Sequence, residues 1–254
     1  MIQRIPYSKI LFLDIETVPQ TDDWNLLSER TQALWEKKTA YQRNNNEISP
    51  EEFYHERAGI MAEFGKIVCI SVGIVVKDSF IHIKSFYGHD EKKLLEDFNS
   101  MLIENFFKPD HILCAHNGKE FDFPYIARRM MINQIEIPAI LQLFGKKPWE
   151  VQHLDTMELW KFGDYKNFTS LDLLANVFEI PTPKDDIDGS QVARVYYDEN
   201  NVERIKDYCE KDVVTLINVF RKMRYDQPLQ RKENKKKQKN PLIERIFYSI
   251  FFND

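Results

Sequence analysis

The stretch Ile10-Leu11-Phe12-Leu13-Asp14-Ile15-Glu16-Thr17 decides the fold of this chain. Its first four residues are apolar without a break, which is typical of a strand buried on both faces in the middle of a covered sheet. Residues two apart in a strand point to the same side, so we expect Asp14 and Glu16 to present paired carboxylates at the strand's end. Such a pair alone is a weak signal, but acids that close a buried run are costly to desolvate unless something positive lies between them. The stretch therefore predicts a central strand that ends in a cation site.

The rest of the chain alternates strand and helix patterns. Further strands are predicted at residues 66–76, 80–87, 112–115 and 151–155, and the first two of these read as an antiparallel hairpin. Helical spacing of apolar residues predicts helices at 90–107, after the turn that precedes Pro124, and at 170–178, 190–197 and 202–223. This order predicts an α/β domain with a five-stranded mixed sheet flanked by helices.

Residues 20–64, between the first two strands, are predicted to form a helical insertion. An interval of this length is too long for a simple loop in a compact domain. Ser49-Pro50-Glu51-Glu52 is a capping box with proline at the first helical position, and Asn44-Asn45-Asn46 is expected to separate two helices.

Composition sets the class of protein. The 254 residues can bury a core without disulfides, and Cys69, Cys114 and Cys209 have no spacing typical of a disulfide framework or a zinc site, so we expect buried thiols. No apolar run approaches the roughly 20 residues that span a bilayer. The chain begins with a strand pattern rather than a signal sequence, so a cytoplasmic location is expected.

The net charge of −5 is unevenly distributed. Residues 221–254 hold 10 Lys and Arg against 4 Asp and Glu, a balance of +6, which leaves −11 for residues 1–220. This asymmetry argues against a general electrostatic grip on nucleic acid and allows a local one through the tail. We expect one domain at 1–224, followed at 225–254 by a basic linker and a short amphipathic segment.

Two other segments carry candidate functional residues. Tyr208 and Asp212 are four apart on a predicted helix and share a face, although each alone is as well explained by a core aromatic and a boundary acid. Asp122 precedes a helix, where it would also serve as an N-cap. Together with Asp14 and Glu16 these acids form a set of hard oxygen donors, which favours Mg²⁺ or Mn²⁺ over zinc. Two such ions would suit phosphodiester cleavage, with Tyr208 orienting the attacking water.

The same residues carry a resemblance to a known superfamily. Asp14-Ile15-Glu16-Thr17, Asn117-x-x-x-Phe121-Asp122 and Tyr208-x-x-x-Asp212 resemble, in order, the three motifs of the DEDD 3'-5' exonucleases. Residues 115–129 and 64–68 most resemble the proofreading exonuclease of family B DNA polymerases and stand-alone bacterial relatives. Tyr208, with Asp at position 207, matches the tyrosine (DEDDy) branch rather than the histidine branch. The resemblance implies a ribonuclease H-like fold, with Asp14, Glu16, Asp122 and Asp212 as metal ligands.

Residues near these motifs are candidates for binding substrate. They are Thr17, Phe64, Asn117, Lys119 and Phe121. Aromatic rings suit stacking on terminal bases and a lysine suits a phosphate, but core packing for the rings and solvation for the lysine are the plain alternatives. His116 and His153 are expected to be structural, and Asp155 lies outside the four-ligand pattern.

The expected substrate is the 3' end of single-stranded or frayed DNA. An exoribonuclease is the nearest alternative, because nothing in the motifs reads a 2'-hydroxyl. A catalytically silent nucleic-acid-binding or protein-binding module is the alternative from another class. Residues 242–251 fit a short amphipathic helix that would dock on its own domain, on a replication or repair protein, or on a membrane surface.

Overall fold

The structure is a computed structural model that describes residues 2–43, 47–164, 166, 168–181 and 187–232. Its centre is one five-stranded sheet with the strand order β3-β2-β1-β4-β5. The strands are β1 (Ile10–Pro19), β2 (Gly65–Val76), β3 (Phe80–Tyr87), β4 (Ile112–Ala115) and β5 (Leu154–Asp155). β1 pairs antiparallel with β2 and parallel with β4, so the predicted mixed sheet is confirmed.

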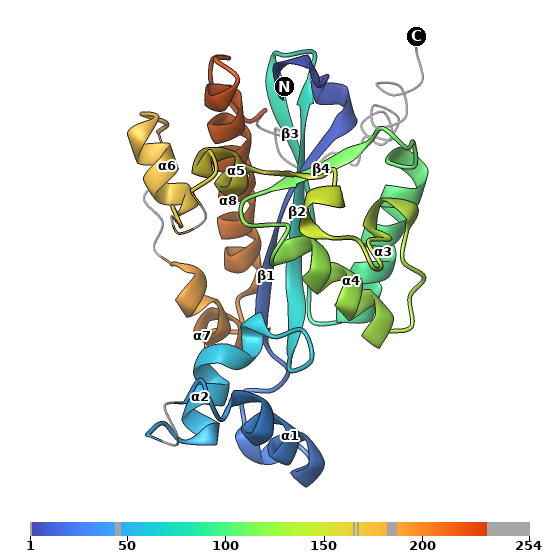
Figure 1. The fold of residues 1–254 in the computed structure, drawn as a ribbon. Coiled ribbons are helices and arrows are strands. Elements are labelled where there is room, and N and C mark those ends of the chain that lie inside the picture. Colours follow the sequence, from blue (N-terminus) through green and yellow to red (C-terminus); the bar gives the residue numbers. More distant parts are fainter. Residues whose placement is uncertain (1, 44–46, 165, 167, 182–186, 233–254) are drawn as a thin grey trace.

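Helices cover both faces of this sheet (Figure 1). On one face lie α3 (Glu91–Asn105) and α4 (Asp122–Ile132), drawn to the right of the strands. On the other lie α5 (Thr156–Lys161), α6 (Leu171–Val177), α7 (Val192–Tyr197) and α8 (Val202–Met223). The described helices thus form a layer on each side of the sheet, as an α/β domain requires.

The apolar start of β1 is buried on both faces, as predicted. Leu11 and Leu13 pack into the core under α3 and α4, while Ile10 and Phe12 pack into the core under α8. All four side chains are fully buried. This packing on both faces fixes the position of β1, and with it the positions of the residues that follow Leu13.

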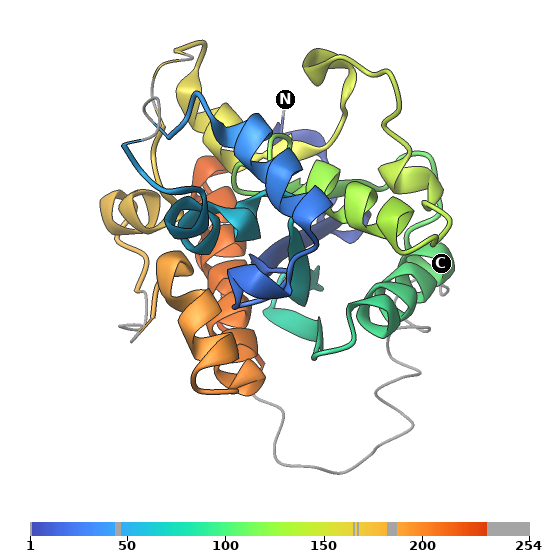
Figure 2. The same cartoon turned by 90° about the horizontal axis from the view of Figure 1, so that it is seen from below.

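The predicted helical insertion between β1 and β2 is present. It contains α1 (Glu29–Thr39) and α2 (Pro50–Arg57), flanked by short 3-10 turns at Trp24–Leu26 and Ala58–Ile60, and it covers one end of the sheet (Figure 2). Ser49 caps α2 by accepting the N–H of Glu52, as its capping box predicts. The insertion has its own small core around Trp35 and Tyr54. The predicted separator at residues 44–46 lies outside the described residues.

Two strands and one helix differ from the sequence prediction. β1 continues to Pro19, so Asp14 and Glu16 lie within the strand rather than at its end, because β2 pairs with it as far as Pro19 and Gly65. β5 has only two residues, Leu154 and Asp155, although a strand was predicted at 151–155. At residue 153 the ring of His153, rather than its backbone, accepts the N–H of Leu113 in β4. Helix α5 was not predicted, although Asp155 and Glu158 have the spacing of a capping box.

The segment after α8 packs back on the domain. Asn218 exchanges two hydrogen bonds with the backbone of Leu229, and Ile81 of β3 exchanges two with Gln230 and Lys232. The described fold therefore continues to Lys232, and the predicted amphipathic segment at 242–251 lies outside the described residues. No helix in the described ranges is long and apolar enough to cross a membrane.

Candidate metal centre

The site begins where β1 runs on beyond its neighbour β4. β4 pairs with β1 only at residues 10–12 and ends at Ala115, so no strand among the described residues pairs with this edge of β1 from Leu13 onward. Asn117 then takes a left-handed conformation (φ 62°), which asparagine tolerates better than most residues. A side chain at Gly118 would lie 2.4 Å from the Ala115 Cβ, so glycine is required in this close turn. The turn brings the start of α4 against the open edge of β1.

Asp122 occupies that open edge. It is the first residue of α4, its side chain is 3% exposed, and its carboxylate accepts the backbone N–H of Ile15 and its own N–H. Phe121 holds the N-cap position without a side-chain cap, so the alternative role of Asp122 as an N-cap is wrong. Asp122 is thus fixed beside the strand that carries Asp14 and Glu16.

The turn before Asp122 is held by Asp155. One of its carboxylate oxygens accepts the Asn117 N–H (2.9 Å) and the other accepts the Lys119 N–H (3.1 Å). The carboxylate also accepts the N–H groups of Met157 and Glu158 at the start of α5. Four backbone donors satisfy this acid, which agrees with its place outside the predicted ligand set. Sequence reasoning missed its holding role.

Asp14 and Glu16 lie on the face of β1 that is turned toward α8. Phe12 and Val18, which share this face, pack against residues of α8. Oxygen atoms of the two carboxylates and the sulfur of Cys209 all lie within 4.8 Å of one another. The Cys209 Sγ–H donates to Asp14 Oδ2 at 3.4 Å. The cysteine is buried as predicted, but no sequence signal placed it against the acids.

α8 supplies the remaining two residues of the set. The hydroxyl of Tyr208 donates to the carboxylate of Asp212 one turn later, so the two share a helix face as predicted. Both side chains are half-buried, and the charge of Asp212 is close enough to raise the pKa values of Asp14 and Glu16. The five residues from three distant segments therefore converge.

The surroundings of Asp14, Glu16 and Asp122 disfavour the charged form of each carboxylate. Burial, followed by repulsion from Asp212 and Asp122, raises the pKa of Asp14 well above its usual range. Burial and then Asp14 do the same for the pKa of Glu16. Burial, with repulsion from Asp155, raises the pKa of Asp122 to about 7. Among the described residues, no Lys or Arg forms an ion pair with Asp14, Glu16 or Asp122.

These residues fit a hard divalent cation. A cation would relieve both the burial of the carboxylates and their mutual repulsion. Oxygen ligands favour Mg²⁺ or Mn²⁺. Burial, with a hydrogen bond to Cys69, raises the pKa of the Cys209 thiol, so it stays protonated and is a poor ligand for a soft metal.

The predicted substrate-binding residues differ in their surroundings. Phe64 is 6% exposed and packs on Trp35 with ring centroids 5.0 Å apart, which is the core packing that the sequence offered as the alternative to stacking on a base. Phe121 is half-buried against Tyr125, and Thr17 hydrogen-bonds the hydroxyl of the same tyrosine.

Polar partners hold the remaining residues of this region. Lys119 pairs with Glu158 (2.6 Å). Both ring nitrogens of His116 and of His153 have hydrogen-bond partners, which confirms that the two histidines are structural. Asn117, whose backbone is held by Asp155, stays near the site.

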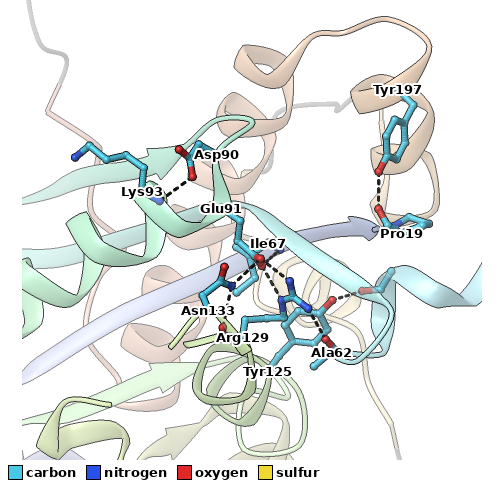
Figure 3. Close-up of polar contacts among 11 residues, drawn as sticks. Pro19, Ala62, Ile67, Asp90, Glu91, Lys93, Tyr125, Arg129, Asn133 and Tyr197 are labelled. Atoms are coloured by element: carbon cyan, nitrogen blue, oxygen red, sulfur yellow. Dashed lines mark hydrogen bonds and ion pairs between the residues drawn. The ribbon is translucent and has the colours of Figure 1, made fainter. Parts of the chain in front are cut away.

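Helix α4, which carries Asp122, is anchored by a buried polar network (Figure 3). Arg129 binds Glu91 through Nε (2.8 Å) and Nη2 (2.5 Å), and its Nη1 donates to the Ala62 carbonyl. Glu91 also accepts the Ile67 N–H at 2.7 Å. Tyr125, one turn before Arg129, donates to the Gly59 carbonyl. α4 is therefore tied to the end of the insertion and to the start of β2.

Comparisons with known proteins show the family and the fold of this chain. Residues 60–246 match a family model described as a predicted 3'-5' exonuclease related to the exonuclease domain of PolB. The fold is similar to part of the family B DNA polymerase of the hyperthermophilic archaeon Pyrobaculum calidifontis, with a TM-score of 0.52 and 15% sequence identity. That match covers 84% of this chain and 24% of the polymerase, so the chain spans about a quarter of its length. A search of curated proteins gave no significant match.

Proposed function

Because the chain belongs to the family of predicted 3'-5' exonucleases related to the exonuclease domain of PolB, we propose that it removes nucleotides from the 3' end of single-stranded or frayed DNA. The observation that carries this proposal is the convergence of Asp14, Glu16, Asp122 and Asp212. These four acids belong to three motifs that lie far apart in the sequence. Sheet, helix and turn each contribute one part of the set. Carboxylates that repel one another in the interior destabilise a fold, and such costly arrangements are typical of functional sites.

Asp14, Glu16, Asp122 and Asp212 would hold the divalent ions, which we propose to be two Mg²⁺ or Mn²⁺. When bound, such ions lower the pKa of a water and neutralise charge on the leaving oxygen of a phosphodiester. The rigid placement of the acids is the protein's own contribution. β1 fixes Asp14 and Glu16, α8 fixes Asp212, and the hydrogen bond from Ile15 fixes Asp122.

Tyr208 is the proposed orienting group for the attacking water. Burial and the neighbouring Asp212 raise the pKa of its hydroxyl above the usual value of 10.0, so it keeps its proton at neutral pH. A protonated phenol can hold a water or a phosphate oxygen in place but cannot act as a strong base. Asp212 orients this hydroxyl by accepting its hydrogen bond.

The test is hydrolysis of end-labelled substrates with Mg²⁺ or Mn²⁺. Single-stranded DNA, duplex DNA and RNA are incubated with wild-type protein and with Asp14→Ala. We expect mononucleotides to be released from the 3' end of single-stranded DNA by wild type and not by the variant. Equal release by both proteins would contradict the proposed site, and absence of any release from all three substrates would favour a silent binding module.

The finer assignments stay predictions. Preference for RNA would make the protein an exoribonuclease, and the RNA arm of the same assay decides this. A role in proofreading or repair, a cytoplasmic location, and recruitment of a replication or repair protein through residues 242–251 are all proposed from the sequence.

A further inference from the structure

A groove of about 610 Å³ lies next to the turn that positions Asp122. Its walls are one side of α4, the segment that follows α4 as far as Val151, and α5. This volume lies within the range of about 300–1,000 Å³ that is usual for ligand sites. None of the proposed metal ligands lines the groove, so it is separate from the metal centre.

Exposed apolar side chains form much of the groove surface. Phe144 is 69% exposed and Met131 is 51% exposed, and both line the groove. Large apolar groups at the surface that line one depression indicate a binding site rather than a core. An exposed phenylalanine offers a flat face on which a base can stack without regard to sequence.

The charges in the groove favour an anionic occupant. Its lining includes Lys119, Arg128, Lys146 and Lys161 against Glu120, Asp155 and Glu158. Two of the three acids are already engaged, because Glu158 pairs with Lys119 and Asp155 accepts four backbone N–H groups. Within the described part of the chain, Arg128, Lys146 and Lys161 form no ion pair with a carboxylate. Three cations thus remain against one free acid.

The groove adjoins the turn that leads into the candidate metal centre. Asn117 and Lys119 line it, and they belong to the same turn that leads into Asp122. α4 has Asp122 at its first turn, and the groove residues Ala127, Arg128 and Met131 follow along the same helix. A strand whose 3' end reaches the carboxylates would have its preceding nucleotides within reach of this surface.

We propose that this groove binds the single-stranded nucleic acid upstream of the nucleotide that is removed, with Phe144 as a stacking platform and Arg128, Lys146 and Lys161 as phosphate contacts. The proposal rests on the proposed function, since it concerns the same substrate. An apolar peptide would leave these cations without counter-charges, which is why a nucleic acid is the better occupant. When a base stacks on Phe144, the phosphates next to that base would lie near Arg128, Lys146 and Lys161.

The experiment measures binding without catalysis. A fluorescent oligothymidine of about 15 nucleotides, within the span of known single-strand sites, is titrated with full-length protein in EDTA and followed by anisotropy. We expect Phe144→Ala to raise Kd about tenfold, the loss typical of one base stack. Lys161→Met should weaken binding less and reduce the slope of log Kd against log salt by about 0.7, as for one lost phosphate contact.

Matched controls lie outside the groove lining. Phe107, which is 54% exposed, is changed to Ala, and the exposed Lys92 of α3 is changed to Met. Both are expected to bind the oligonucleotide like wild type. Unchanged Kd in Phe144→Ala and Lys161→Met, or equal losses in the controls, would overturn the proposal.

A second readout separates this inference from the proposed function. The p-nitrophenyl ester of thymidine 5'-monophosphate has no upstream nucleotides, so the groove variants should hydrolyse it with Mn²⁺ as fast as wild type. Loss of this activity in the groove variants would also overturn the proposal, because the groove residues would then affect hydrolysis itself rather than the binding of upstream nucleotides. Absence of hydrolysis in wild type, with the Kd effects intact, would reject the exonuclease and leave the groove as a nucleic-acid site.

Discussion

The acid Glu91 and the paired acids Asp14 and Glu16 have opposite surroundings in this fold. Glu91 is 9% exposed and accepts four hydrogen bonds, from Ile67 N–H, from two nitrogens of Arg129, and from Asn133. Asp14 and Glu16 have each other and further acids as neighbours, and burial and repulsion raise their pKa values. We refer to these as the Glu91 network and the carboxylate cluster, the latter being Asp14, Glu16, Asp122 and Asp212.

The difference shows how burial alone fails to identify function. An acid that is paired and fully hydrogen-bonded holds elements together, and here it ties α4 to β2. Acids that lie against one another in the interior have raised pKa values and favour the protonated form, and a bound cation would stabilise their charged form. The first arrangement is explained by the protein's own residues, and the second is one that a bound cation would stabilise.

The largest expected effect is on activity in the carboxylate cluster. Asp212→Asn removes a proposed ligand and the hydrogen-bond acceptor of Tyr208, so 3' release should fall on the order of 10⁴-fold, roughly 5 kcal/mol of barrier. The rate of mononucleotide release with Mn²⁺ measures this. Asp207→Asn is the control, because this exposed residue lies on the same helix and pairs only with Lys206 among the described residues. A similar loss in both variants would speak against the assignment.

The next largest effect is on stability in the Glu91 network. Glu91→Gln leaves Arg129 buried without its counter-charge, which should lower the free energy of unfolding by about 3–5 kcal/mol. Urea denaturation of the metal-free protein measures the change. Replacing both residues, as in Glu91→Leu with Arg129→Met, should cost less than the sum of the single changes. Additive losses would mean that the pair is not coupled.

The cluster should make the metal-free protein less stable as pH rises. The pKa of Asp122 is about 7 in the folded protein against an ordinary 3.8, so between these values the folded state binds a proton that the unfolded state has lost. The free energy of unfolding therefore falls by a few kcal/mol between about pH 4 and pH 7. Urea midpoints in EDTA across this range measure the slope. Asp122→Asn should flatten it, and an unchanged slope would disprove the assignment.

The smallest effect concerns the orienting tyrosine. Tyr208→Phe keeps the ring in its place and removes only the hydroxyl, so kcat should fall roughly 10- to 100-fold, as for other groups that orient the reacting atoms. Metal binding should be unchanged, since the four carboxylates remain. Thermal unfolding with and without Mn²⁺ checks the second point. A weaker stabilisation by Mn²⁺ in the variant would indicate that Tyr208 acts through the metal ligands.

Much of the fold followed from local patterns in the sequence. The buried run at residues 10–13, the hairpin of β2 and β3, and the N-cap at Ser49 were confirmed because each depends on neighbouring residues. The length of β1 was not predicted, because it depends on pairing with β2, some 50 residues later. Helix α5 was not predicted because Asp155 was interpreted only as an acid at a strand's end, whereas it also caps this helix.

The site was predicted less completely than the fold. The types of residue and their spacing placed Asp14, Glu16, Tyr208 and Asp212 on the right elements. Cys209 beside Asp14 and the Arg129–Glu91 pair could not be predicted, because contacts between distant segments leave no local pattern. Phe64 illustrates the reverse, since the aromatic core of the insertion buries a ring that the sequence alone left open for stacking.

One measurement tests the central contrast most directly. Mn²⁺-dependent release of mononucleotides from single-stranded DNA is compared in wild type, Asp14→Asn and Glu91→Gln, at a temperature where all three are folded. We expect release by wild type and by Glu91→Gln, and none by Asp14→Asn. Release by Asp14→Asn at the wild-type rate would contradict it, because the carboxylate cluster would then not be the site of reaction.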